Sequence, residues 1–276
     1  MRLTLLGVRG STPAPGRDFV RYGGHTSCIA VTRDDEDLPD LVLDAGTGFR
    51  GLPGLLGGAA YDGSILLSHL HWDHVQGIPF CPSGDRDDSR VDVFLPAQEG
   101  LSGRDLLAQL MAPPAFPITP EGLRGDWSFH AVQPGMFETD GYVVTACEVT
   151  HKGGRTYAYR VEADGASLAY APDHAPALGL DDATLRTMEG VDLLVQDAQF
   201  IDRERLIADD YGHATVRDAV ELAQRVHARA VLLFHHGPGR KDDDLDRIAD
   251  DIAADVTVLT AYEGMVLDVT SRTMSR

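Results

Sequence analysis

The sequence predicts an α/β fold that contains two β-sheets within one compact domain spanning residues 1–276. Short apolar runs typical of strands occur in two series, separated by Gly-rich turns. Two amphipathic segments near the end of the chain predict helices between late strands. No low-complexity linker divides the chain, and 276 residues can bury a substantial core.

The strand-like runs share a high content of apolar residues and end at turns. The first series comprises residues 3–8, 27–32, 40–44, 64–68 and 91–95. The second comprises residues 127–132, 142–149, 156–162, 167–171, 192–196, 230–235, 256–260 and 264–269. Two series of this kind predict two sheets.

Both predicted helices carry their apolar residues on one face. In residues 214–228 that face holds Ala219, Val220, Leu222, Ala223 and Val226. In residues 242–254 it holds Leu245, Ile248, Ala249 and Ile252. Asp242, Asp243 and Asp244 stand at the amino end of the second segment, where negative charge stabilises a helix.

Residues 96–126 form an insert between two predicted strands. Its helical part, Arg104 to Met111, leads into the stiff apolar sequence Pro113-Pro114-Ala115-Phe116-Pro117. Two interpretations stay open, because loops of this length are often functional but not always. The insert is either a lid that roofs a pocket or an ordinary surface connection.

Charge and cysteine content exclude several classes of protein. The 43 acidic and 24 basic residues give a formal charge of −19, which disfavours tracking of a nucleic-acid backbone. The first residues read as a strand and lack a signal peptide, and no apolar stretch approaches membrane-spanning length. We therefore expect a cytoplasmic protein without a membrane segment. Cys28, Cys81 and Cys147 form no CxxC pattern, so reduced, mostly buried thiols are expected.

The sequence His69-Leu70-His71-Trp72-Asp73-His74 places four metal-binding side chains within six residues, directly after an apolar run. Alternate side chains of an extended backbone share a face, so His69 and His71 can approach one ion. Asp73 and His74, past the turn, can approach a second ion. The motif predicts a two-metal site, with Trp72 packed beneath the cluster.

Four further candidates each follow or end a strand-like run: His151, Asp173, Asp197 and His235. Strand ends are where rigid sheets present side chains to a shared cleft. A lone histidine at one of these positions is more often a packed or surface residue. Their repetition alongside the ligand cluster favours one metal site.

Together, these motifs resemble the metallo-β-lactamase superfamily, and the resemblance covers nearly the whole chain. It extends to the Gly-rich entry Gly7-Val8-Arg9-Gly10-Ser11 and to Leu43-Asp44-Ala45-Gly46-Thr47-Gly48, an element that supports the metal loop in that family. The resemblance implies a four-layer αββα sandwich with the site along one edge of the two sheets.

The resemblance also implies a ligand set for two divalent metal ions. His69, His71 and His151 would hold metal one, Asp73, His74 and His235 would hold metal two, and Asp173 would bridge them. Imidazole and carboxylate donors without thiolate suit Zn²⁺, with Mn²⁺ and Fe²⁺ as alternatives. The redox di-iron branch carries a carboxylate at the position of His71, so the histidine favours hydrolysis.

Within the superfamily, Leu193–Phe200 and Tyr211–Thr215 resemble two motifs of a phosphodiesterase branch. That branch includes tRNA 3′-processing endonucleases and phosphoribosyl cyclic phosphodiesterases. The resemblance assigns catalytic roles to His213, which protonates the leaving oxygen, and to Asp197, which orients it, with Asp73 beside them. The match departs at Asp197 and Ala214, where the endonucleases usually have Glu and Ser. The alternative is structural, with Asp197 ending a strand and His213 preceding a helix.

The expected function is hydrolysis of a small phosphodiester, either cyclic or linear, by a hydroxide that bridges the two metals. The endonucleases carry a long basic arm between the isolated histidine and the bridging aspartate, whereas residues 152–172 leave room only for a hairpin. Together with the acidic charge, this argues against tRNA as a partner. Similar proteins are commonly dimers, so a homodimer is expected by analogy.

Two rival functions stay open on the same residues. One is a lactone or thioester hydrolase of the same fold, which needs no pair of the kind formed by Asp197 and His213. The other is a metal-holding accessory protein of a biosynthetic pathway, without turnover of its own.

Overall fold

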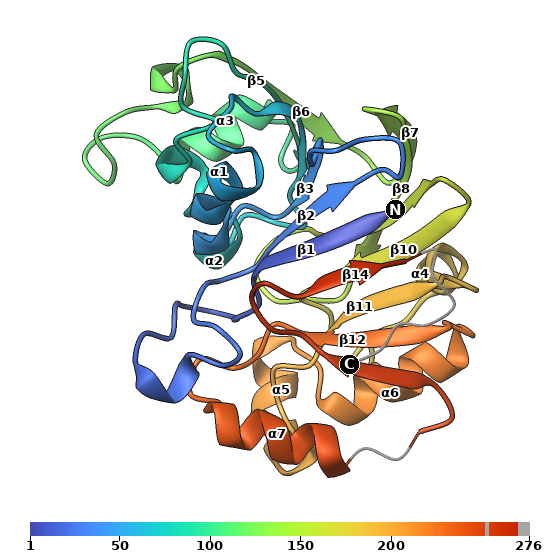
Figure 1. The fold of residues 1–276 in the computed structure, drawn as a ribbon. Helices are drawn as coiled ribbons and strands as arrows, with labels where there is room; N and C mark the ends of the chain where they lie inside the picture. Colours follow the sequence, from blue (N-terminus) through green and yellow to red (C-terminus); the bar gives the residue numbers. More distant parts are fainter. Residues whose placement is uncertain (252–253, 270–276) are drawn as a thin grey trace.

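The computed structural model describes residues 1–251 and 254–269, in which two seven-stranded sheets pack face to face (Figure 1). In spatial order, the first sheet consists of β14 (Val266–Asp268), β1 (Arg2–Gly7), β2 (Cys28–Thr32), β3 (Leu41–Leu43), β4 (Asp62–Leu66), β5 (Arg90–Pro96) and β6 (Asp126–Val132). The second consists of β13 (Thr257–Thr260), β12 (Ala230–Phe234), β11 (Leu193–Asp197), β10 (Ala166–Ala171), β9 (Thr156–Ala163), β8 (Tyr142–Val149) and β7 (Gly135–Thr139).

Each sheet has a parallel part and an antiparallel part. Strands β3 to β6 are parallel to one another, as are β10 to β13, whereas β14, β1, β2 and β3 pair antiparallel and so do β7 to β10. Strands β3, β11 and β12 are buried along their whole length, as expected for sheets covered on both faces. The carboxyl ends of the parallel strands meet at one edge of each sheet.

Apolar side chains fill three layers and thereby produce four layers of secondary structure. Leu3, Tyr159 and Leu232 belong to the cluster between the two sheets. Leu106 of α3 packs on the outer face of the first sheet, and Leu222 of α6 packs on the outer face of the second. The predicted αββα sandwich is therefore confirmed.

The helices are short, and all lie outside the sheets (Figure 1). They are α1 (Leu52–Leu55), α2 (Trp72–Val75), α3 (Gly103–Ala108), α4 (Asp182–Met188), α5 (Arg205–Tyr211), α6 (Val216–Arg225) and α7 (Asp242–Asp251). Single 3₁₀ turns occupy Arg17–Phe19, Thr47–Gly51, Ile78–Phe80, Pro120–Gly122 and Asp202–Glu204. Within the described residues, no helix is long and apolar enough to cross a membrane.

Every strand-like run has a counterpart in the structure, but the division between the sheets differs from the two series. Strands β6 and β14, from the second series, join the first sheet, where Leu267 of β14 pairs with Leu3 of β1. The edge strand β7 was not predicted, because it is largely exposed and lacks an apolar alternation. The helical segments 214–228 and 242–254 contain the shorter α6 and α7, and Ile252 lies outside the described residues.

Candidate metal centre

The sheet topology brings the predicted site residues to one edge of the sandwich. His69 follows β4, Asp173 follows β10, and His235 follows β12, all of which belong to the parallel parts of the two sheets. His151 follows β8, which runs in the same direction as β10 because both are antiparallel to β9. These side chains converge although more than 160 residues separate the first from the last.

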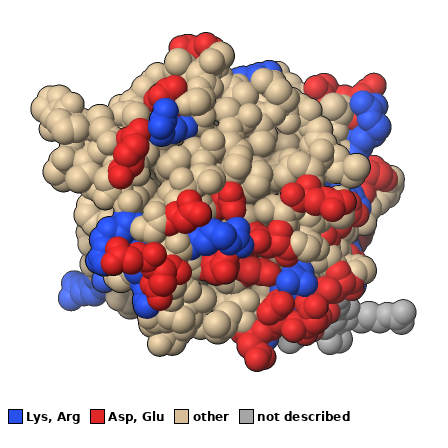
Figure 2. Space-filling model, turned by 90° about the horizontal axis from the view of Figure 1, so that it is seen from above, with Lys and Arg blue, Asp and Glu red and all other residues tan. Residues whose placement is uncertain are grey.

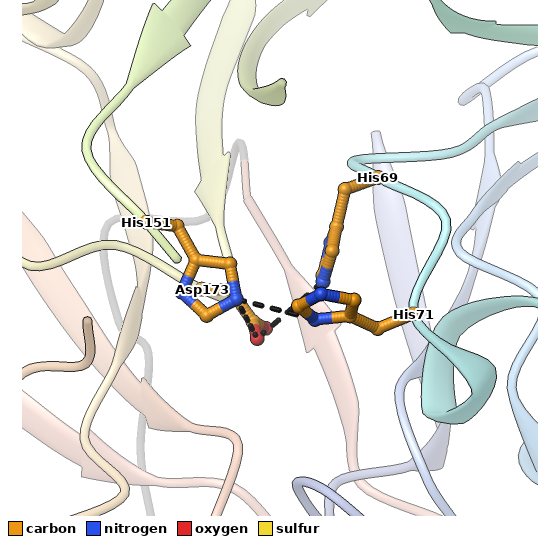
Figure 3. A group of neighbouring side chains, drawn as sticks. All are labelled: His69, His71, His151 and Asp173. Carbon is orange, nitrogen blue, oxygen red and sulfur yellow. Dashed lines mark hydrogen bonds and ion pairs between the residues drawn. The ribbon is translucent and has the colours of Figure 1, made fainter. Parts of the chain in front are cut away.

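A first ligand group consists of His69, His71, His151 and Asp173, whose donor atoms all lie within 4.8 Å of one another (Figure 3). Nε2 of His151 lies 3.3 Å from Nδ1 of His71 and 3.5 Å from Oδ2 of Asp173. Nε2 of His69 lies 3.7 Å from the same carboxylate oxygen. These are the residues predicted to hold metal one, together with the predicted bridge.

A second ligand group consists of Asp73, His74 and His235. Nε2 of His74 lies 3.3 Å from Oδ2 of Asp73 and 3.3 Å from Nε2 of His235. Oδ1 of Asp173 lies 3.0 Å from His74 and 3.1 Å from His235. Asp173 therefore turns one oxygen toward each group, which is the arrangement a bridging ligand requires.

The donor atoms of both groups fit a pair of divalent ions. Nε2 of His69 and Oδ1 of Asp173 are buried yet form no hydrogen bond. Buried polar atoms without partners are rare in folded proteins unless they serve an ion, water or catalysis. Five imidazoles and two carboxylates without thiolate suit Zn²⁺, Mn²⁺ or Fe²⁺.

The protonation states also favour metal binding by the first group. Burial lowers the pKa of His69, His71 and His151, so each ring stays neutral and keeps a free lone pair near neutral pH. Burial also opposes a positive charge on His74. The carboxylates of Asp173, Asp73 and Asp44 outweigh this effect of burial and raise the pKa of His74. A metal ion in the second group would therefore displace a proton from His74.

Hydrogen bonds behind the ligands hold their rings in place. Asp44, fully buried just after β3, accepts from Nδ1 of His74 at 2.7 Å, from the backbone N–H of Ser68 at 2.7 Å and from the Tyr170 hydroxyl at 2.8 Å. Such outer contacts set the tautomer and orientation of a ligating imidazole. The resemblance predicts that the sequence around Asp44 supports the metal loop, and these hydrogen bonds tie Asp44 to Ser68 and His74 of that segment.

Two other ligands are held by backbone groups. Nδ1 of His151 donates to the carbonyl oxygen of Gly212 at 2.7 Å, so its Nε2 faces the first group. Gly212 has a φ of 75°, in the left-handed region that favours glycine. The N–H of Ser11 donates to Oδ2 of Asp73 at 2.6 Å. Sequence analysis did not single out Ser11 as a site residue; its place in the Gly-rich entry was the available signal.

His213 and Asp197 form a pair beside the second group. Nδ1 of His213 donates to Oδ2 of Asp197 at 2.7 Å, and its ring stacks on His235 with 5.2 Å between centroids. The backbone N–H groups of His174 and Gln199 also donate to Asp197, at 3.2 and 3.0 Å. Burial would lower the pKa of His213, but Asp197 more than compensates and raises it to about 9.

The site opens into a cleft of about 660 Å³. Its walls include five of the seven predicted ligands as well as His213, Ser11, Lys152 and Tyr211. The prediction that Trp72 packs beneath the cluster is wrong: its side chain is 72% exposed and lines this cleft. As the first residue of the four-residue helix α2, Trp72 projects outward, whereas the next residues are buried.

The remaining histidines near the site do not line the cleft. His174 supports Asp197 through its backbone, as described above. Nε2 of His236 donates to the carbonyl of Ala261 at 2.9 Å, and Nδ1 of His25 lies 3.2 Å from the Thr47 hydroxyl. These contacts give the three residues structural roles around the site.

Comparisons with known proteins identify the family of this chain. A family model for the β-lactamase superfamily domain matches residues 40–236, which include all seven predicted ligands. The ribonuclease Z of Halorubrum lacusprofundi is 26% identical, over 85% of this chain and 86% of the relative. The ribonuclease Z of Natronomonas pharaonis is 25% identical, over 91% of this chain and 92% of the relative.

Solved structures with the same fold include YhfI from Bacillus subtilis, with a TM-score of 0.73 and 20% identity over 97% of this chain and 99% of that protein. A diphosphatase of the PhnP family has a TM-score of 0.70 and 19% identity, over 97% of both chains. Zinc-bound PqqB from Methylobacterium extorquens has a TM-score of 0.70 and 18% identity, over 97% of this chain and 100% of that protein. The chain belongs to the β-lactamase superfamily and has the metallo-β-lactamase fold of metal-dependent hydrolases.

Proposed function

We propose that this protein is a metal-dependent phosphodiesterase that hydrolyses a small phosphodiester. The observation that carries the proposal is the His213–Asp197 pair, in which His213 lies beside both ligand groups and lines the same cleft while Asp197 is buried behind it. A departing alkoxide needs a proton, and a buried histidine oriented by a carboxylate can supply one. The relatives named ribonuclease Z support cleavage of a phosphodiester bond.

Seven residues would hold two divalent ions: His69, His71 and His151, then Asp73, His74 and His235, with Asp173 shared between them. When bound, such ions activate water and offset negative charge on phosphoryl oxygens. The carboxylate of Asp173 would keep the two groups at a fixed separation. Asp44 and Gly212 would hold His74 and His151 in the ring orientation that ligation needs.

His213 would act on the leaving side of the reaction. Its Nδ1 is occupied by Asp197, so Nε2 is the nitrogen that carries the transferable proton. Water adds to phosphorus and loses one proton to the solvent, the P–O bond to the alcohol breaks, and the alkoxide takes the proton from Nε2. The products are a phosphomonoester and an alcohol, and bulk water restores the proton to His213. Asp197 is a positioning residue in this step.

A small substrate is supported by the charge and shape of the described surface. Lys152 is the only Lys or Arg among the described residues that line the cleft. Figure 2 shows acidic side chains interspersed with fewer basic ones, without a continuous basic patch on the face it displays. Residues 152–172 form only the β9–β10 hairpin and the turns that flank it, with no projecting arm. Nucleic-acid binding rests on clustered Lys and Arg.

RNA is the second candidate substrate, because the curated relatives reported above are ribonucleases. The two substrates differ in their dependence on salt. Cleavage of a structured RNA through several phosphate contacts weakens steeply between about 50 and 200 mM salt. Hydrolysis of a single small phosphodiester at a buried site should change far less.

A substrate panel tests the proposal. Protein stripped with a chelator and reloaded with Zn²⁺, Mn²⁺ or Fe²⁺ is offered bis-nitrophenyl phosphate, cyclic nucleotides, a precursor tRNA transcript and a lactone. We expect turnover of a small phosphodiester that depends on reloading. Faster turnover of the lactone than of any phosphodiester would assign the protein to the rival hydrolase class. Efficient, salt-sensitive cleavage of the transcript would make RNA the substrate.

A further inference from the structure

An apolar pocket of about 300 Å³ lies beside the metal-binding cleft and shares two wall residues with it, Trp72 and Leu110. One side of the pocket is formed by α2 and the turn after it, including the fully buried Ile78. The other side is formed by the 96–126 insert, including Met111 and Phe116. Continuity with the cleft makes the pocket an extension of the candidate active site.

The pocket differs sharply from the cleft in its chemistry. Gln76 is its only polar wall residue, and no charged side chain lines it among the described residues. Trp72 and Phe80 at its walls are 72% and 59% exposed. Large aromatic side chains that stay in contact with water around a concave apolar surface mark a binding site more often than a structural feature.

The insert holds the outer wall in place by apolar contacts. The ring of Phe116 packs edge-on against Phe80, with 5.9 Å between centroids and an interplanar angle of 84°. Leu107 of α3 is buried between the pocket and the first sheet. The insert drawn green at the upper left of Figure 1 therefore forms a wall of a cavity as well as a connection between β5 and β6.

We propose that this pocket binds an uncharged aromatic group of the substrate while the phosphodiester occupies the adjoining cleft. This inference rests on the proposed function and narrows it to phosphodiesters that carry an aromatic substituent. Trp72 directly precedes Asp73 in the chain. A substrate ring stacked on the Trp72 indole would therefore lie close to the reacting phosphate. A volume at the lower limit of about 300–1,000 Å³ for ligand pockets suits one ring system.

The pocket wall contains no Lys or Arg among the described residues, and this disfavours a negatively charged ligand. A second phosphate in this pocket would lose its water and find no Lys or Arg to replace it. A chain of nucleotides is therefore disfavoured there. A single aromatic ring loses little on leaving water and gains stacking contacts with Trp72 and Phe116.

The test compares two esters with the same nitrophenolate leaving group, one with a methyl and one with a 2-naphthyl group on the other ester oxygen. Stacking on an aromatic side chain changes affinity by about 10-fold or more, so kcat/KM should favour the naphthyl ester by about 10-fold. Phe116→Ala should bring this ratio close to one. Ile118→Ala, on the same insert but outside the pocket wall, is the matched control and should keep the wild-type ratio.

A binding measurement separates the pocket from catalysis. Metal-free protein titrated with 2-naphthol should show saturable binding, and Phe116→Ala should weaken it by about 10-fold. Ala115→Trp, which places an indole at an exposed wall position, should block binding and does not depend on removal of a packed ring.

The outcomes distinguish the two proposals. Naphthol binding that both variants weaken, without turnover of either ester in reloaded protein, would support the pocket and overturn the proposed function. An ester ratio that Phe116→Ala and Ala115→Trp leave unchanged would overturn the pocket. Absence of saturable naphthol binding by the folded wild-type protein would overturn it as well.

Discussion

Replacement of His213 by alanine should slow hydrolysis of esters with poor leaving groups and leave the metals bound. The side chain contacts Asp197 and stacks on His235, and it belongs to neither of the two ligand groups proposed to hold metal. Its removal takes away the proton for the leaving alkoxide but leaves every donor atom of those groups in place. The effect should therefore depend on how much the leaving oxygen needs a proton.

The magnitude follows from the role and the protonation state of His213. A positioned general acid contributes about 10²–10⁴-fold. The pKa of about 9, against an ordinary value of 6.5, keeps nearly all His213 protonated at pH 7.5 and corresponds to about 3 kcal/mol of interaction with nearby carboxylates. Metal ions held by Asp73 and Asp173 would cancel the contribution of these two carboxylates to that interaction. The contribution of Asp197 would persist in the metal-loaded enzyme. We expect a loss of about 10³-fold on an alkyl ester and less than about 10-fold on a nitrophenyl ester.

The assay measures kcat/KM for a pair of diesters that differ only in the leaving group, together with metal content per protein. His130→Ala, a surface histidine on β6, is the matched control and should leave both rates unchanged. Equal loss on the alkyl and nitrophenyl esters would refute the proton-donor role. Loss of metal in step with activity would move His213 into the ligand set.

Three further predictions concern the metal site. Gly10→Ala should remove metal from the second group and lower activity, since its Cβ would lie 2.3 Å from Nδ1 of His235; metal content checks this, with retention of both ions as the contrary result. Asp44→Asn should lower the free energy of unfolding by about 3 kcal/mol and weaken metal binding, because an amide cannot accept all the hydrogen bonds that the buried carboxylate accepts. Denaturant titration of metal-free protein measures the first effect, and an unchanged midpoint would contradict it. Below the raised pKa of His74, a proton competes with the metal ion for this ring. Affinity for the second ion should therefore fall by about 10-fold for each unit by which the pH falls. Calorimetry between pH 6 and 8 measures this affinity, and a constant affinity would contradict proton release.

The convergence of the candidate metal ligands could be predicted from sequence because His69, His151, Asp173 and His235 each come shortly after a strand. A run of buried apolar residues fixes the direction of a strand, and the residue after it must lie at the sheet edge. Asp173 follows β10 and His235 follows β12, and both strands pair in parallel with β11 between them. Their convergence therefore requires only this strand pairing. The fold prediction succeeded for the same reason, since the apolar runs that define β-strands also fill the three core layers.

Two of the elements that sequence patterns missed, α5 and β7, are short and largely exposed. Helix α5 carries Leu206 and Ile207 on its solvent side, so no apolar stripe marks it as a helix. Strand β7 lies at a sheet edge with Met136 largely exposed, so its pattern resembles that of a loop. Periodicity reports burial on one face, and neither element has such a face.

Trp72 shows most clearly what spacing could not decide. An apolar residue inside a ligand cluster is expected to be buried, and the orientation of a four-residue helix is set by tertiary contacts rather than by its own sequence. In the structure, Asp73 and His74 of α2 point inward. Consecutive residues of a helix are rotated by about 100° around its axis, so the indole of Trp72, one residue earlier, points toward water. Burial of the two ligands therefore requires that Trp72 be exposed at the boundary between the metal cleft and the apolar pocket. Because Trp72 lines both cavities, it would contact the ester group of the proposed phosphodiester, and substrate selectivity at this position is therefore the sharpest test of the proposed site.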